Sequence, residues 1–283
     1  MIEIRHKETG QVLAQVEGDT LVGADLRELE LTGADLRGKD LSRARLDNCE
    51  LCYSDMTGAK LERVTFRGAH LCDATLSGAN LRGASFSDGT HAGGAILLHC
   101  DLSGADLSGA DLRQIDFRES NFCSANLSHA DFSEARGVRS NFSRARAAGA
   151  LLVHTNLRES RFIAADLRGC HLNGAQLIKS DLSDAVLGGT RESIAVLNMA
   201  NLEMATLDRA NLQYTVMMDA NLRHASLQDC NLSHANIGGT IMRSANVRGA
   251  NFAGVELATV TMDFANFSQA TNADIPSYKE NLR

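Results

Sequence analysis

The segment Leu102–Leu112 reads LSGADLSGADL, in which a large apolar residue recurs at every fifth position. This five-residue hydrophobic repeat, called the beat below, runs through most of the chain. Counting in fives from Leu21, all fourteen positions through Phe86 are Leu, Met or Phe. After an interruption the beat resumes near residue 97 and continues to Phe267. Among the 34 positions from residue 102 to residue 267, the exceptions to a large apolar residue are Gly137, Ala147 and Glu192.

Neither regular secondary structure explains a period of five, because strands alternate every two residues and helices repeat every 3.6. The chain must therefore turn a corner once per unit, and each unit then sends one large apolar side chain inward. The residue two places earlier is small, so we expect a second inward position there, with the other three positions facing water. Examples of this small residue are Ala24, Ala34, Ala79, Ala105, Ala125, Ala210, Cys49, Ser54, Val64, Cys100, Cys170 and Cys230.

The repeating motif is A-(D/N)-L-x-x, as in Ala24-Asp25-Leu26 and Ala250-Asn251-Phe252. Over roughly residues 20–270 this motif resembles the pentapeptide-repeat family. The resemblance implies an all-β fold, a right-handed quadrilateral β-helix with four pentapeptides, or twenty residues, per coil. About twelve such coils, spaced like strands at about 4.8 Å, would form a single-domain solenoid on the order of 60 Å long.

A coil of twenty residues can be tested independently, because residues twenty apart should stack on neighbouring coils. Opposite charges recur at this spacing, and facing opposite charges on neighbouring strands are mildly favourable. The charged sets are Glu119/Arg139/Glu159/Lys179, Arg27/Asp47/Arg67, Asp25/Arg45, Asp40/Lys60, Glu62/Arg82, Asp116/Arg136 and Arg146/Asp166. Two further columns at the same spacing are Phe122/Phe142/Phe162 inside the coil and Asn211/Asn231/Asn251 outside it.

The beat is broken at both ends of the chain and at two internal places. Residues 1–19 alternate like two strands around a turn at Gly10, so we expect a hairpin that caps the first coil. Residues 271–283 leave the pattern and form a C-terminal cap or tail. The beat shifts by one residue at 87–97, which predicts a single inserted residue there. At Gly188–Ile194, Glu192 takes an inward slot, and we expect that corner to bulge and turn the carboxylate outward.

The net charge of −7, without a signal peptide or a long apolar stretch, favours a soluble cytoplasmic protein with no membrane partner. Seven cysteines in so long a chain do not indicate a disulfide framework. Cys49 and Cys52 spell CxxC, but the coil should point them in opposite directions, which excludes a metal or redox motif. Cys52 and Cys72 are twenty apart and both outward; we expect adjacent free thiols, with a reversible disulfide as the alternative.

Catalysis needs a nucleophile, a base and an orienting group that converge in a cleft, and a convex solenoid offers none. We therefore predict no enzyme activity, no catalytic residues, no cofactor and no metal site. The best local cluster is Asp88, His91, His99 and Asp101. Its spacing matches no established metal motif, so ordinary surface residues are the favoured interpretation.

Charge is distributed unevenly along the middle of the chain. Residues 101–134 hold seven acids against two arginines, including one per side of a single coil at Asp101, Asp106, Asp111 and Asp116. The following residues, 135–168, carry the arginines Arg136, Arg139, Arg144, Arg146, Arg158, Arg161 and Arg168. These residues predict either a bipolar surface for a partner or charges that mainly pair across coils. An alternative acidic patch of stacked like charges comprises Glu30, Asp35, Glu50 and Asp55.

The favoured function is a non-catalytic, rod-shaped scaffold that binds a protein partner through its charged faces. The alternative comes from the family: some pentapeptide-repeat proteins resemble DNA, bind DNA gyrase or topoisomerase IV and protect against topoisomerase poisons. A 60 Å length of DNA carries roughly 35 negative charges, whereas this chain has 35 acids offset by 28 bases, so mimicry along the whole length is poor. Direct nucleic-acid binding is not expected, because the arginines are interleaved with acids. Members of the family often dimerise at the C-terminal end, here around Phe264, Phe267, Tyr278 and Leu282.

Overall fold

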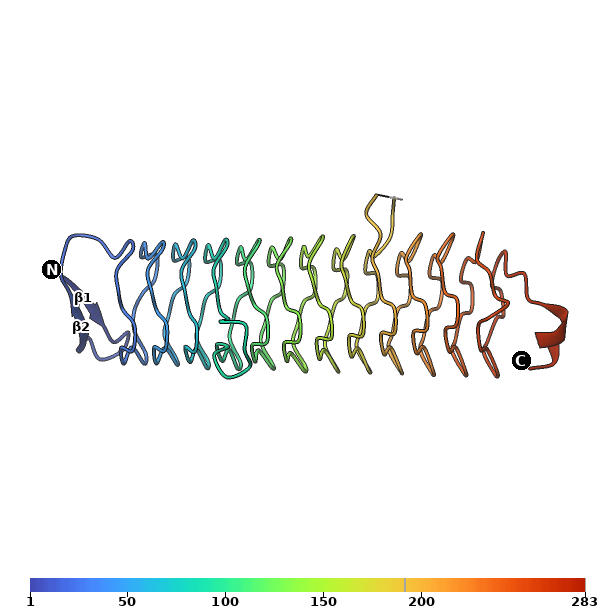
Figure 1. Ribbon diagram of the computed structural model, residues 1–283, viewed down its shortest axis with the longest axis horizontal. Helices are drawn as coiled ribbons and strands as arrows, with labels where there is room; N and C mark the ends of the chain where they lie inside the picture. Colours follow the sequence, from blue (N-terminus) through green and yellow to red (C-terminus); the bar gives the residue numbers. More distant parts are fainter. Residues whose placement is uncertain (191, 283) are drawn as a thin grey trace. The chain divides into compact units, whose positions relative to one another are not determined.

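The computed structural model describes residues 1–190 and 192–282 and divides into two compact units, Met1–Ala145 and Arg146–Arg283. Its named elements are strands β1 (Ile2–Arg5) and β2 (Val12–Val16) and a 3-10 helix, η1 (Ser277–Leu282) (Figure 1). The predicted irregularity at 188–194 and the predicted tail at 271–283 include Arg191 and Arg283, which lie outside the described residues. Between the named elements the chain winds in coils joined by single parallel β-bridges.

In the first unit, four ladders of bridges begin five residues apart, and each step of a ladder spans twenty residues. Their first steps are Asp25↔Arg45, Glu30↔Glu50, Asp35↔Asp55 and Asp40↔Lys60. The chain therefore passes four sides before it returns to its starting side. This confirms the four-sided coil of twenty residues that the repeat predicts.

The second unit has the same construction, described by itself. Its ladders start with Arg146↔Asp166, Leu151↔His171, Asn156↔Gln176 and Arg161↔Asp181, again twenty residues per step. The predicted asparagine column lies on one of these ladders, as Asn211↔Asn231 and Asn231↔Asn251. The Nδ2 of Asn251 donates to Oδ1 of Asn231 at 3.4 Å, so side chains extend the backbone ladder.

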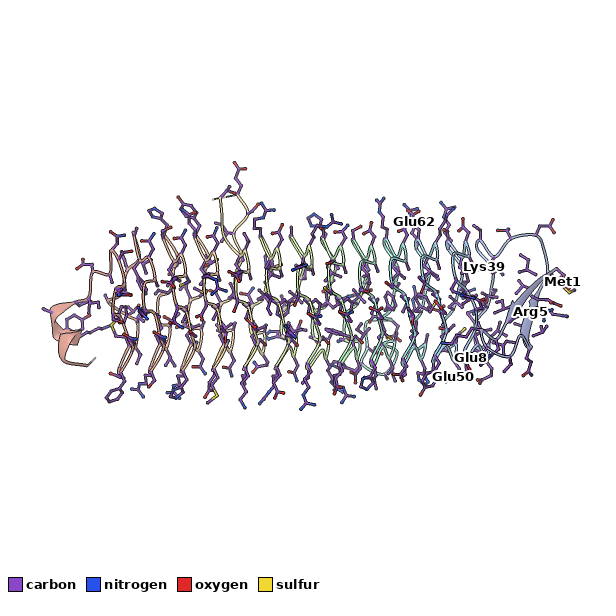
Figure 2. All side chains as sticks on the ribbon, turned by 180° about the vertical axis from the view of Figure 1, so that it is seen from behind. Met1, Arg5, Glu8, Lys39, Glu50 and Glu62 are labelled. Atoms are coloured by element: carbon purple, nitrogen blue, oxygen red, sulfur yellow. The ribbon has the colours of Figure 1, made fainter. Side chains whose placement is uncertain are left out.

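The core of each unit consists of the residues that the beat assigns to it. Large residues from Leu26 to Phe252 are buried, as are most of the small residues two places before them, including Cys49, Cys100, Cys170 and Cys230. In the first unit the rings of Phe122 and Phe142 stack with centroids 4.9 Å apart and an interplanar angle of 2°. By contrast, Glu50 and Glu62 point away from the coil (Figure 2).

Each corner of the coil is made by the residue two places after the large apolar one. This residue adopts a left-handed backbone, with φ of 65° at Gly104 and Gly109 and of 61° at Glu119. Glycine adopts this conformation without steric cost, which explains the S-G dipeptides of the segment that sets the beat. Many corners nevertheless carry other residues, because the backbone hydrogen bonds on both sides of the corner hold the turn in place.

The prediction of a single inserted residue near 87–97 is wrong. Bridges on the four sides join His70↔Ile96, Thr75↔Asp101, Asn80↔Asp106 and Ser85↔Asp111, a spacing of 26 instead of twenty. The insertion is therefore six residues, and it forms a loop against the coils of the first unit (Figure 1). A beat of five cannot distinguish one extra residue from six, because both shift the pattern equally.

A second insertion, in the second unit, did not shift the register of the beat, and its sign in the sequence was Glu192 at a position for a large apolar residue. His171↔Val196 and Asp181↔Thr206 are 25 apart, so five residues are added at 188–194. The insertion projects from the coils of this unit (Figure 1). Glu192 is exposed, as expected, but it belongs to this added loop and does not occupy an inward slot of the repeat.

The hairpin expected at residues 1–19 is present. Strands β1 and β2 pair antiparallel in the register Ile2↔Val16 and Ile4↔Ala14, and Gly10 has φ of 70°. The hairpin is hydrogen bonded to the first coils: Asp35 N donates to Arg5 O at 2.8 Å. At the other end of the chain, η1 lies beside the last coil of the second unit, where Tyr278 Oη donates to Ala258 O at 3.1 Å.

Candidate functional site

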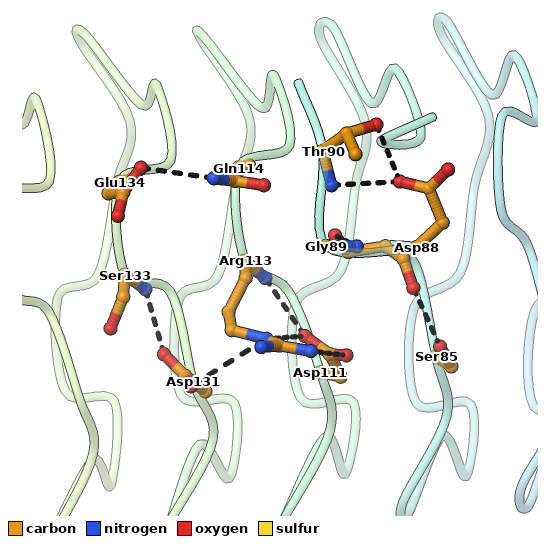
Figure 3. Close-up of polar contacts among 11 residues, drawn as sticks. Ser85, Asp88, Gly89, Thr90, Asp111, Arg113, Gln114, Asp131, Ser133 and Glu134 are labelled. Atoms are coloured by element: carbon orange, nitrogen blue, oxygen red, sulfur yellow. Dashed lines mark hydrogen bonds and ion pairs between the residues drawn. The ribbon is translucent and has the colours of Figure 1, made fainter. Parts of the chain in front are cut away.

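The four aspartates predicted to encircle one coil do lie on its four sides. Asp101, Asp106, Asp111 and Asp116 belong to four different bridge ladders of the first unit. Two of the four carboxylates bind an arginine two residues later in the chain, Asp111 to Arg113 at 2.8 Å and Asp116 to Arg118 at 2.7 Å (Figure 3 shows the former). The acidic belt is therefore half neutralised from within.

The other two carboxylates of the belt are held by amides from the next coil. Asn121 Nδ2 donates to Asp101 Oδ1 at 3.0 Å, and Asn126 Nδ2 donates to Asp106 Oδ1 at 2.9 Å. Both aspartates also accept a backbone N–H two residues later in the chain, at 3.0 Å. Asp101 and Asp106 are therefore half-buried, and their carboxylates contact amides of the next coil.

The arrangement Asp-Leu-Arg recurs as an ion pair within one repeat, and the sequence interpretation missed it. The aspartate and the arginine flank the inward leucine, so both side chains leave on the outer surface. The pKa of Asp35 falls to about 2, chiefly because Arg37 donates a side-chain hydrogen bond. The recurrence of D-(L/F)-R in the sequence was the available signal, with Phe117 replacing the leucine in one instance. The five pairs are Asp25/Arg27, Asp35/Arg37, Asp111/Arg113, Asp116/Arg118 and Asp166/Arg168.

Pairs within a repeat are tighter than the pairs predicted across coils. Arg27 binds Asp25 at 2.6 Å, whereas Arg45 on the next coil lies 3.7 Å from the same carboxylate. Lys60 lies 3.6 Å from Asp40, as predicted but loosely. Several other predicted pairs form no ion pair within 4 Å in the described residues: Asp47/Arg27, Asp47/Arg67, Glu62/Arg82, Asp116/Arg136 and Arg146/Asp166.

This competition determines which arginines of the first unit remain available. Arg136 lies on the ladder next to Asp116, but Asp116 is bound by Arg118. Arg139 lies 3.6 Å from Glu119, the pair that the twenty-residue spacing predicted. Arg136 and Arg144 are exposed, and no carboxylate lies within ion-pair distance of either in the described part of this unit.

The second unit repeats the arrangement with its own arginines. Arg146 lies on the ladder next to Asp166, whose carboxylate is bound by Arg168 at 2.6 Å. Arg146, Arg158 and Arg161 are all exposed. Within the described residues of this unit, none of these three guanidinium groups has a carboxylate at ion-pair distance. The predicted basic set therefore contains available charges in each unit, considered separately.

The alternative acidic patch is built as predicted but carries less charge than its residues suggest. Glu30↔Glu50 and Asp35↔Asp55 are bridged on adjacent coils. Arg37 binds Asp35 at 2.7 Å and lies 3.8 Å from Asp55. Nδ1 of His70 lies 2.8 Å from Glu50. Two cationic side chains, one of them a histidine that is charged only when protonated, thus lie among the four carboxylates.

The residues weighed as a metal cluster do not converge. Asp88 Oδ1 accepts the Thr90 hydroxyl at 2.8 Å (Figure 3), and His91 Nδ1 lies 3.3 Å from Gln114 O. His99 lies 3.6 Å from Glu119, while Asp101 accepts the amide of the next coil. Within residues 1–190 and 192–282, no group of three or more His, Cys, Asp or Glu side chains is placed to hold a metal ion.

Some hollows do exist on the surface, contrary to the expectation of a wholly convex exterior. One in the second unit has a volume of about 350 Å³ and is lined in part by His234, Asn236, Glu256 and Thr259. One in the first unit, of about 250 Å³, lies at the base of the 87–95 loop, where arginine and acidic side chains alternate. The residues lining these two hollows include no Ser or Cys.

The second unit also exposes large apolar side chains that the sequence analysis did not single out. Met199, Met204 and Met218 are 70%, 47% and 41% exposed. Met199 N donates to Met218 O at 2.9 Å, so these two lie on neighbouring coils. Phe264, expected near the C-terminal end, is 77% exposed, whereas Phe267 packs 5.5 Å from Phe252.

No helix in the described residues is both long enough and apolar enough to cross a membrane. The side chain of Leu282, which was expected in a C-terminal contact, lies outside the described part of the chain.

Comparison with known proteins identifies the repeat. The family described as pentapeptide repeats matches residues 30–68, 53–88, 100–136 and 140–175, and the pentapeptide repeat region matches residues 160–237. No curated protein matches the chain.

Among solved structures, the chain is similar to HetL, a pentapeptide repeat protein involved in heterocyst differentiation regulation in the cyanobacterium Nostoc sp. strain PCC 7120. The identity is 31% over 86% of this chain and 89% of HetL, with a TM-score of 0.27. QnrB1, a plasmid-mediated fluoroquinolone resistance protein, is 17% identical over 73% of this chain and 85% of its own, with a TM-score of 0.32. Rfr23 from the cyanobacterium Cyanothece 51142 is 31% identical over 37% of this chain and 62% of its own, with a TM-score of 0.18.

Proposed function

Because the chain belongs to the pentapeptide-repeat family, we propose that it is a non-catalytic scaffold that binds an acidic partner protein through exposed arginines. Repeat solenoids present extended surfaces on which side chains recur at fixed spacing. The partner-binding residues in this proposal are Arg136 and Arg144 of the first unit, beside Arg139, which is paired with Glu119, and Arg146, Arg158 and Arg161 of the second. Arg168 supports them by occupying the carboxylate of Asp166.

One observation carries the proposal: the aspartates stacked beside Arg136 and Arg146 are bound by other arginines. Asp116 binds Arg118 and Asp166 binds Arg168. A cationic group without a close carboxylate attracts an external anion, whereas the charge of a paired group is largely neutralised by its partner. Arginine is also enriched in protein interfaces, where its planar guanidinium can donate two parallel hydrogen bonds to one carboxylate.

A protein partner fits the surface better than a nucleic acid does. The chain carries a net charge of −7, and its arginines are interleaved with acids and not with aromatic residues. The exposed methionines Met199, Met204 and Met218 supply apolar contact area, and flexible thioethers adapt to protein surfaces. The acidic belt, neutralised in part by its own arginines, contributes less to this proposal than its four aspartates suggest.

The test uses the intact chain immobilised on beads and a nuclease-treated extract of the source cells. We expect one acidic protein to be retained in a salt-sensitive manner, and its capture to fall about tenfold or more in Arg136→Glu/Arg144→Glu and in Arg158→Glu/Arg161→Glu. The matched control is Arg82→Glu/Arg223→Glu, which makes the same change in charge at exposed arginines outside the set. Unchanged capture by both test variants, or equal loss in the control, would refute the proposed surface.

A gyrase- or topoisomerase-binding role is the second candidate, and the specific observation that favours it is the stacking of Glu30 on Glu50 and of Asp35 on Asp55. Arg37 reduces the negative field of this patch, which places the role second. A supercoiling assay with and without a topoisomerase poison tests it directly. Neither inhibition nor protection at micromolar protein would eliminate this candidate.

The ends of the chain complete the proposal. The hydrogen bond from Asp35 N to Arg5 O supports a capping role for the N-terminal hairpin. The exposed ring of Phe264 offers an apolar contact near the C-terminal end, which supports self-association there. Light scattering of the full chain and of a chain truncated after Thr271 tests this part: a dimer of the full chain that the truncation abolishes supports it, and a monomer in both contradicts it.

A further inference from the structure

Cys52 and Cys72 lie directly beside each other on neighbouring coils of the first unit. Leu51 N donates to His70 O at 2.7 Å, and Tyr53 N donates to Cys72 O at 2.8 Å, so backbone hydrogen bonds fix the register on both sides of the pair. Each cysteine directly follows a buried leucine and points outward at the same corner. Adjacent strands are about 4.8 Å apart, which lies within the roughly 4.4–6.8 Å between the Cα atoms of a disulfide.

The two thiols are also accessible, which separates them from most other cysteines of the chain. Cys52, Cys72 and Cys123 are half-buried, while Cys49, Cys100, Cys170 and Cys230 are buried. Cys49, the nearest in sequence, points inward and its Sγ contacts Leu26 O at 2.8 Å. Cys123 occupies the same slot of its repeat as Cys52 does, but it has serines, Ser103 and Ser143, on the neighbouring coils. It is therefore an internal control for accessibility without a stacked partner.

The geometry points to a redox-responsive pair: Cys52 and Cys72 form a reversible disulfide that links two neighbouring coils of the first unit when the chain meets a low-molecular-weight disulfide such as oxidised glutathione. In-register side chains on parallel strands run side by side, so closing the bond requires the two Cβ atoms to tilt toward each other. A bond closed with strain is more easily reduced than an unstrained one, which makes this pair suited to a reversible response.

The disulfide forms by two successive thiol–disulfide exchanges. Burial and the neighbouring Cys72 thiol raise the pKa of Cys52 to about 11, so this thiol is mostly protonated near neutral pH. Cys72 loses its proton and attacks one sulfur of oxidised glutathione, forming a mixed disulfide and releasing one glutathione thiolate, which takes up a proton. Cys52 then attacks the Cys72 sulfur and releases the second glutathione. Two protein thiols are oxidised and one glutathione disulfide is reduced to two thiols.

The link would strengthen the part of the first unit to which the N-terminal hairpin attaches. Gly33 N donates to Cys52 O at 2.8 Å, and Lys7 Nζ donates to Tyr53 O at 2.5 Å. Oxidation therefore joins the coil that contacts the hairpin to the coil after it. Because a disulfide restricts the unfolded chain, the oxidised protein should unfold at a higher temperature than the reduced protein.

The experiment incubates the folded full-length chain in glutathione buffers of increasing oxidised fraction, blocks free thiols with N-ethylmaleimide and analyses tryptic peptides by mass spectrometry. We expect a reducible link between peptides 46–60 and 68–82, with a loss of about 2 Da from the intact mass. Fragment ions place the link at Cys52, and a Cys49→Ala variant, which retains the pair, excludes its inward neighbour. In the same samples Cys123 should carry glutathione or N-ethylmaleimide and form no link within the chain.

Single variants complete the test. Cys52→Ser and Cys72→Ser should each abolish the linked peptide, and Cys52→Ser should leave Cys72 as a stable glutathione adduct. The inference is overturned if the folded wild-type chain keeps separate adducts or alkylated thiols at both positions in the most oxidising buffer. It is also overturned if the link is between two chains, which non-reducing electrophoresis would show as a dimer.

Discussion

The ring of Phe117 occupies the core slot that Gly137 leaves empty on the next coil. A Cβ added to Gly137 would overlap the ring carbons Cε2 and Cζ of Phe117. The same ring packs edge-on against Phe122, Phe132 and Phe142, with centroids 5.3 to 5.9 Å away. The space that Gly137 leaves in the core is therefore filled by an aromatic side chain from the neighbouring coil.

This relationship predicts that restoring the apparent consensus is harmful. Gly137→Leu should destabilise the protein by about 1–3 kcal/mol or more, because the leucine competes with Phe117 for one space. Phe117→Ala should cost about 3–5 kcal/mol by emptying the slot. The double variant should be more stable than the sum of the two losses implies, since leucine then fills the vacated space. Denaturant unfolding of the four proteins measures this coupling, and strict additivity would contradict it.

The ion pairs within repeats predict how stability depends on acid. Arg37 lowers the pKa of Asp35 to about 2, from an ordinary value of 3.8. The unfolded chain therefore takes up a proton before the folded chain does, so the pair stabilises the protein above about pH 4 and this contribution is lost as pH falls toward 2.

Asp35→Asn and Arg37→Gln should each reduce the loss of unfolding free energy between about pH 4 and pH 2 (the acid limb), and the double variant should reduce it no further. Because the side chains of Arg37 and Asp35 are 57% and 34% exposed, the effect should shrink in high salt. Urea unfolding at about pH 5 and about pH 2.5, in low and high salt, measures it. A wild-type acid limb in both single variants would show that the pair does not form in solution.

The five-residue insertion predicts an unusual tolerance to deletion. Removing residues 190–194 leaves Gly188 and Gly189 between Leu187 and Ala195, which rebuilds one ordinary pentapeptide with glycine at the corner. Stability should change by less than about 1 kcal/mol, because shortening a loop alters closure entropy only slowly. Removing only residues 190–193 leaves one residue too many for a corner and should cost more than about 2 kcal/mol. Thermal unfolding of the two deletions compares them directly, and equal losses would contradict the proposed register.

The two insertions show what a repeating pattern conveys and what it hides. The inward side chains follow from the beat because every fifth residue meets the same physical requirement. The lengths of the loops at 87–95 and 188–194 do not, since the beat reports length only up to multiples of five. Only pairings between coils, such as His70↔Ile96 and His171↔Val196, reveal that six and five residues were added.

In the candidate site, the positions of the charged residues could be predicted from the sequence, but their pairing could not. The positions of Asp116 and Arg136 on one ladder were predictable from their spacing of twenty. Their failure to pair was not, because Arg118 competes for Asp116 from within the same repeat, only two residues away. Proximity along the chain orders this pair at less entropic cost than pairing across coils, where two long side chains must meet in one geometry. Attention to the recurring D-(L/F)-R triplet would have found the competition.

The last prediction concerns Lys279, whose ammonium group contacts carbonyl oxygens at the end of the second unit. Nζ donates to Leu257 O, Ala258 O and Val260 O at 2.9, 2.6 and 2.8 Å. Burial lowers the pKa of this lysine, so the group gives up hydration to make these contacts. Carbonyls on a terminal coil have no further coil to donate to them, and a charged donor satisfies them well.

Lys279→Met should therefore free the tail and speed hydrogen exchange of the amides at 252–265 by an amount corresponding to about 1–3 kcal/mol of local opening. Lys279→Arg should restore part of the protection, because its planar guanidinium keeps the charge but fits three converging carbonyls less well. Lys39→Met, at an exposed lysine of the first unit, is the control and should leave this exchange unchanged. Equal exchange in Lys279→Met and the wild-type chain would show that the tail is held by other contacts, such as that of Tyr278 with Ala258.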